Sequence, residues 1–89
     1  METENDKYLE RLVEERSAKG DRVAANILGS LYLDRALREL DLAFLERAEE
    51  QFALAARLGH VSAAEFLEGI WPMVKLEYAE KIAKKKGEG

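Results

Sequence analysis

The side chains that could perform chemistry are sparse in this sequence. His60 is the only histidine, and there is no cysteine among the 89 residues. A lone histidine directly after Gly59 is typical of a turn, and a catalytic or metal-binding role would need partner ligands at suitable spacing, which we do not find. The serines lack a nucleophile-elbow context, and no glycine-rich phosphate loop is present. We therefore expect no enzyme activity, no metal and no cofactor.

Charged residues are abundant, but their spacing is that of a helix surface. Glutamates and arginines alternate at intervals that suit ion pairs on solvated helix faces. The formal net charge of −4 disfavours a broad nucleic-acid-binding surface. In the last segment, "KIAKKKGEG", four lysines gather: Lys81, Lys84, Lys85 and Lys86. We interpret them as a solvated helix end that complements the helix dipole, with residues 84–89 as a frayed tail. The alternative is a contact with nucleic acid or an acidic partner.

The elements that must position these residues are helices. Apolar residues recur at helical spacing in five runs, and the only proline is Pro72. Gly20 and Gly59 should end two helices in the left-handed conformation, and Asp21 and Ser62 should cap the helices that follow. The boundary between the second and third helices falls at Asp34 or Asp41. We expect one all-α domain, residues 1–89, of about five helices. Tyr8, Leu9, Val23 and Ile27 belong to the apolar runs, and we expect Tyr32 and Trp71 in the core.

The chain also contains two similar stretches. Gly59 lies 39 residues after Gly20, and the same offset places Ala24 on Ala63, Leu28 on Leu67 and Tyr32 on Trp71. A period near 40 residues in an all-helical chain points to stacked helical hairpins. Each hairpin of such a stack buries one face against its neighbour.

These stretches, "GDRVAANILGSLY" and "RAEEQFALAARLGHVSAAEFL", resemble the Sel-one-like repeat, a relative of the tetratricopeptide repeat. The resemblance covers about residues 8–71, as one complete repeat flanked by two halves. It departs at "LDRALRELDLAF", where the family has a glycine-rich acidic loop, and at Glu68, which stands opposite Gly29. The family pattern of the first helix falls on Ala24, Leu28, Gly29 and Tyr32, and that of the second on Ala48, Phe52, Ala55, Ala56, Gly59 and His60.

The resemblance implies a short superhelix of α/α-hairpins whose first helices line a curved, protein-binding surface. We therefore expect a non-catalytic protein–protein interaction module, such as a small adaptor, regulator or inhibitor-like subunit, which binds a partner helix or peptide. The expected partner-binding residues on that face are Asn26, Ser30, Leu33, Asp34, Glu65, Gly69 and Met73.

Two other functions stay open at this point. The first is a homodimer formed through the last helix, because Val74, Leu76, Tyr78 and Ile82 spread over more than one face of it. The second is a weak contact of the C-terminal lysines with nucleic acid or an acidic partner. The polar, acidic N-terminal segment lacks the features of a signal peptide, and no apolar run reaches the roughly 20 residues of a membrane span. These features predict a cytoplasmic protein that does not contact a membrane.

Overall fold

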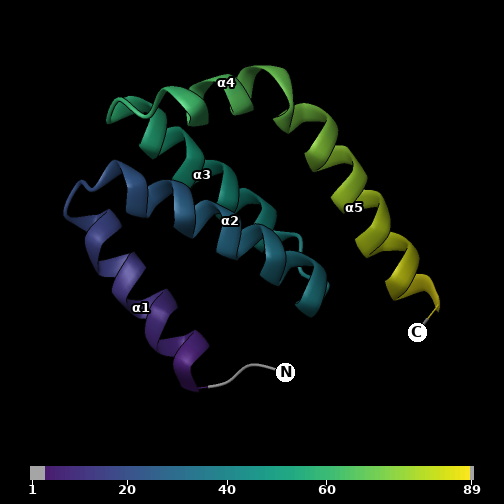
Figure 1. Cartoon of the computed structure of the whole chain (residues 1–89). Helices are drawn as coiled ribbons and strands as arrows, with labels where there is room; N and C mark the ends of the chain where they lie inside the picture. The colour runs from purple at the N-terminus through teal and green to yellow at the C-terminus, as the bar shows by residue number, and fades with distance from the viewer. Residues whose placement is uncertain (1–3, 89) are drawn as a thin grey trace.

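The structure, a computed structural model, describes the backbone of residues 4–88 and the side chains of residues 7–87. Residues 4–88 form five α-helices and no strand (Figure 1), which confirms the all-helical class expected from the apolar spacing. The helices are α1 (Glu4–Ala18), α2 (Arg22–Glu39), α3 (Ala43–Arg57), α4 (Val61–Gly69) and α5 (Trp71–Glu88).

Two of the turns between helices follow the glycine signals in the sequence. Gly20 and Gly59 have φ angles of 91° and 101°, the left-handed conformation that an L side chain rarely adopts. Asp21 then caps α2, because its Oδ1 accepts hydrogen bonds from the backbone N–H groups of Val23 and Ala24, both at 3.0 Å. The predicted ends of α1 and α3 and the predicted cap of α2 are confirmed.

The other boundaries rest on less obvious residues. Helix α2 continues to Glu39 and ends at Leu40, a non-glycine residue with φ of 51°. Asp41 follows and accepts a hydrogen bond from Ala43 N at 2.9 Å, so the boundary lies at Asp41 and not at Asp34. The prediction that Ser62 caps α4 was wrong. His60 is the cap: its Nδ1 accepts a hydrogen bond from Ala63 N at 3.1 Å.

Helix α2 lies at the centre of the structure, between α1 and α3 (Figure 1). Small residues allow the helices to approach closely. Ala25, Ala55 and Ala63 are essentially fully buried where α2, α3 and α4 meet. At Gly29 the backbone of α2 lies against the ring of Phe52 on α3, so that a Cβ atom there would be only 2.7 Å from Phe52 Cε1. The packing of α2 on α3 therefore depends on small side chains.

Helix α5 is held at two points. Near its start, Trp71 is buried and its ring packs against Phe52 and Phe66, with centroid distances of 5.8 and 6.0 Å. Farther along, Ile82 is fully buried with Ala36, at the far end of α2 and the start of α3. Beyond this second contact, α5 continues through the lysine segment. Residues 84–88, which we expected to fray, belong to α5, and residue 89 lies outside the described residues.

Four residues of the apolar runs are exposed. Tyr8 and Leu9 on α1 are 69% and 48% exposed, and Val23 and Ile27 on α2 are 54% and 41% exposed. Helix α1 packs chiefly against α2, where Val13 is the buried contact, and Tyr8 and Leu9 lie outside that contact. Tyr32 is half-buried, as a side chain between clusters rather than at the centre of one.

Candidate functional site

Residues of α2, α3 and α4 line an open groove of about 380 Å³, which we call the α2–α4 groove. Asn26, Ser30 and Leu33 line it from α2, where spacings of four and three residues place them on one face. These are three of the seven residues expected at a partner-binding surface. The remaining lining residues are Phe52 on α3, and Ser62 and Phe66 on α4.

The α2–α4 groove combines an apolar floor with polar groups at its edge. The rings of Phe52 and Phe66 are 5.0 Å apart, and Phe52 is fixed from below by its contact with Gly29. Ser30 Oγ donates to the backbone oxygen of Asn26 at 3.4 Å, whereas the side-chain amide of Asn26 has no hydrogen bond within the described residues. The groove therefore offers an apolar surface beside an amide whose donors and acceptor are available.

The other four expected residues do not line the groove. Asp34 is exposed and forms an ion pair with Arg38, with 3.1 Å between Oδ2 and Nε. Glu65 and Gly69 are exposed on α4, and Met73 is exposed on α5.

The residues of α4 that do line the groove, Ser62 and Phe66, lie 39 residues after Val23 and Ile27. The prediction added the 39-residue offset to the residues on one face of α2. This selects the face of α4 that points in the same direction as that face of α2. Two helices that bound a groove turn opposite faces toward it. For this reason the offset did not select Ser62 and Phe66. The i, i+4 spacing of Ser62 and Phe66 places both on one face of α4, and this spacing is the signal that could have found them.

A second cavity, of about 470 Å³, lies at the other end of α2. Leu37 lines it from α2, and Lys81, Lys84 and Lys85 line it from α5. We call it the lysine pocket. The three lysines follow the i, i+3, i+4 spacing of one helix face. None of them forms an ion pair within the described residues, although Lys81 Nζ lies 5.6 Å from the ring centroid of Tyr78.

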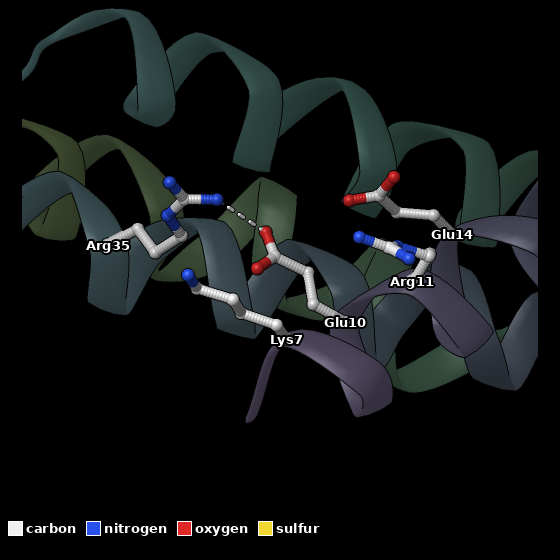
Figure 2. Close-up of a pocket in the computed structure, with 5 residues that line it drawn as sticks. All are labelled: Lys7, Glu10, Arg11, Glu14 and Arg35. Atoms are coloured by element: carbon white, nitrogen blue, oxygen red, sulfur yellow. Dashed lines mark hydrogen bonds and ion pairs between the residues drawn. The ribbon is translucent and has the colours of Figure 1, made fainter. Parts of the chain in front are cut away.

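A cluster of charged side chains joins α1 to α2 around a small cavity of about 230 Å³ (Figure 2). Arg35 Nη1 donates to Glu10 at 2.8 Å, Arg35 Nε donates to Glu39 at 2.6 Å, and the guanidinium lies 4.6 Å from the centroid of the Phe44 ring. Hydrogen bonds from Arg35 to Glu39 and Glu10 raise the pKa of Arg35 further above its already high value. These contacts hold a permanent cation between carboxylates and attach α1 to α2.

Tyr32, on the same side of α2, is affected by the same charges. Burial raises the pKa of its phenol, and the carboxylates of Glu14 and Glu10 raise it further. Since an ordinary tyrosine already titrates near 10, Tyr32 stays protonated at neutral pH. It therefore serves in this structure as a half-buried packing residue between α1, α2 and α3.

A third polar group connects α3 to α5. Lys75 Nζ donates to Glu49 at 2.8 Å, and this contact lowers the pKa of Glu49. The indole of Trp71 lies close enough to add to that lowering, but its buried Nε1 has no partner at hydrogen-bond geometry within the described residues. The Glu49–Lys75 pair is about half exposed, so we interpret it as a surface link between helices.

Among the side chains of residues 7–87, no three His, Cys, Asp or Glu side chains are grouped so that they could hold a metal ion. Among the described helices, none combines the length and the apolar character that crossing a bilayer requires. Comparisons of the chain with protein-family models, with curated proteins and with solved structures found no match. The resemblance to the Sel-one-like repeat thus stays a prediction, and the function has to be argued from the groove.

Proposed function

We propose that this protein is a non-catalytic interaction module that binds a short segment of another protein in the α2–α4 groove. The observation that carries the proposal is the composition of the groove: apolar surface from Leu33, Phe52 and Phe66 lies next to the available amide of Asn26. Apolar surface accommodates a partner's side chain, and polar groups at the edge fix its orientation. Peptide-binding grooves in helical proteins combine these two elements.

We further infer that α2 to α5 are two consecutive helical hairpins of a Sel-one-like kind. Three features support this inference. The turns at Gly20 and Gly59 have the same left-handed geometry. Ala24 and Ala63, related by the 39-residue offset, are both buried. A groove lies between α2 and α4, which are the first helices of the two hairpins. In stacked hairpins, the first helices line one continuous face, which places the partner across both units.

The test compares three forms of the tagged protein. Asn26→Tyr/Ser30→Tyr places two bulky, uncharged side chains across the groove without replacing a buried residue. Val23→Tyr/Ile27→Tyr is the matched control, because both residues are exposed on the same helix and neither lines the groove. Affinity capture from the native cells, read by mass spectrometry, should recover a protein with the wild type and the control but not with the groove variant. Equal recovery by all three forms, each folded by circular dichroism, would contradict the proposal.

A second candidate function is self-association through the outer side of the α4–α5 junction. Ile70, Met73 and Leu76 are 50%, 58% and 61% exposed at intervals of three residues. Three adjacent exposed apolar side chains are the kind of patch that a symmetric dimer buries. Val74 and Tyr78, by contrast, pack inward against the core clusters.

Light scattering at micromolar concentration tests this candidate. A dimer predicts twice the chain mass of 10.1 kDa for the wild type and the chain mass for Leu76→Glu. A wild-type protein that stays monomeric argues against it.

A further inference from the structure

The occupant of the groove can be specified further by the charge at one end of α2. We propose that the α2–α4 groove and the lysine pocket together bind one acidic, amphipathic protein segment, whose apolar side chains enter the groove while its carboxylates meet Lys81, Lys84 and Lys85. This inference rests on the proposed function, since it names the class of partner for the same surface.

The two cavities lie in succession along α2. Leu33 lines the groove and Leu37 lines the lysine pocket. Residues four apart on a helix lie one turn apart on the same face. From Asn26 to Leu37 the α2 axis rises by about 16 Å, at about 1.5 Å per residue. Helix α5 closes the far end: Ile82 is buried in one cluster with Ala36, and Lys81, Lys84 and Lys85 line one cavity with Leu37 of α2.

Three positive charges come together in the lysine pocket. Elsewhere on the described surface, several basic side chains are paired: Arg35 with Glu10, Arg38 with Asp34 and Lys75 with Glu49. The three lysines of the pocket have no such pairs within the described residues, in a protein whose net charge is −4. Three unpaired cations on one helix face attract a carboxylate-bearing ligand at long range and orient it.

The dimensions set the length and pattern of the partner. A helix of about 11 residues covers about 16 Å, and so does an extended strand of about five residues. One end should carry large apolar side chains, and the other end two or three Asp or Glu residues. A nucleic acid fits less well, because its phosphates need a continuous basic track. The α2–α4 groove has none: its lining contains no lysine or arginine.

The experiment is peptide selection from a random 16-residue phage library, run in parallel on four proteins. They are the wild type, Lys84→Glu/Lys85→Glu, the control Lys19→Glu/Lys86→Glu, and the groove variant Asn26→Tyr/Ser30→Tyr. The two lysine variants have the same net charge, and Lys19 and Lys86 line neither cavity. Selected peptides are then synthesised, and their affinities are measured by fluorescence polarisation at low and high salt. A fluorescent 20-nucleotide oligothymidylate serves as a second probe.

We expect the wild type and the control to select peptides with an acidic cluster beside apolar anchors. Lys84→Glu/Lys85→Glu should bind these peptides about tenfold or more weakly at low salt, with a smaller difference at high salt. The groove variant should not bind them. Groove-dependent peptides without acidic enrichment, or equal losses in both lysine variants, would overturn the acidic partner and leave the proposed function standing. The absence of any groove-dependent peptide would overturn both. Lysine-dependent binding of the oligonucleotide without binding of acidic peptides would replace the protein segment by a nucleic acid.

Discussion

The close contact between Gly29 and Phe52 predicts that Gly29→Ala lowers the stability of the protein, although Gly→Ala usually raises it in a helix. In an exposed helix, Gly→Ala stabilises by roughly 1 kcal/mol, because alanine restricts the unfolded chain. At Gly29 the added Cβ would lie 2.7 and 2.8 Å from two carbons of the Phe52 ring, well inside the 3.4–4 Å of ordinary contact. Either the ring or the whole helix α2 must then move by roughly 0.7 Å.

The ring of Phe52 has little freedom to move away. It is 4% exposed and packs against Phe66 and Trp71, with centroid distances of 5.0 and 5.8 Å. Overpacking costs about 1–3 kcal/mol in well-packed cores, and the upper part of this range, about 2–3 kcal/mol, applies to a ring that is confined on two sides. After the gain in helix propensity is subtracted, Gly29→Ala should destabilise the protein by about 1–2 kcal/mol. Since Phe52 also lines the α2–α4 groove, the substitution should weaken partner binding as well.

The assay is urea unfolding, followed by circular dichroism, of a double-mutant cycle with Phe52→Leu. Leucine removes the ring carbons that clash, so Gly29→Ala should be neutral or stabilising by up to about 1 kcal/mol in that background, with a coupling energy of about 1–3 kcal/mol. Gly69→Ala is the control, because Gly69 is helical and a Cβ atom added there would have nothing within 4 Å; it should be neutral or stabilising. A Gly29→Ala protein as stable as the wild type would refute the close approach of α2 and α3.

Three further predictions concern single contacts. Replacing His60, the cap of α4, by alanine should destabilise the protein by about 1 kcal/mol in urea unfolding, whereas His60→Asp should keep or improve stability; equal effects would argue against the cap. The lowered pKa of Glu49 implies a stability contribution that is present above its ordinary value of 4.5 and is lost as pH falls through the lowered value. Lys75→Gln should therefore reduce the stability difference between pH 7 and pH 3, by less than about 1 kcal/mol for so exposed a pair; an unchanged pH profile would contradict this. Finally, Ser17 is buried and donates a hydrogen bond to Gln51 Oε1 at 2.6 Å, which links α1 to α3. Ser17→Ala should therefore lower the free energy of unfolding by about 1 kcal/mol in the same assay. No loss of stability would show that this link is dispensable.

The local signals in the sequence were sufficient for the helices and for two of the four turns between them. Glycine at a left-handed position and aspartate at a cap act through their own backbone neighbours, so Gly20, Asp21 and Gly59 could be interpreted without the fold. At Leu40, by contrast, no local signal in the sequence predicts the turn. It adopts the left-handed conformation without the residue type that signals it, while its half-buried side chain packs against the cluster of Ala36 and Ile82. Packing between distant helices stabilises a turn that local preference disfavours.

The candidate site divides in the same way. Periodicity along α2 alone placed Asn26, Ser30 and Leu33 on one face, because that depends only on the roughly 3.6 residues per turn of an α-helix. Which face of α4 lies across from them depends on how the hairpins stack, and so Ser62 and Phe66 were found only in the structure.

The lysines present the same contrast on a larger scale. Their number and their clustering near the C-terminus belong to the sequence, but their position beside Leu37 exists because Ile82 is buried against α2 and α3. By itself the sequence determined the five helices, two of their turns and one face of the groove, through interactions between residues a few positions apart. The tertiary structure decided which faces meet and where the unpaired charge lies, because contacts between residues far apart in the chain depend on the packing of whole helices.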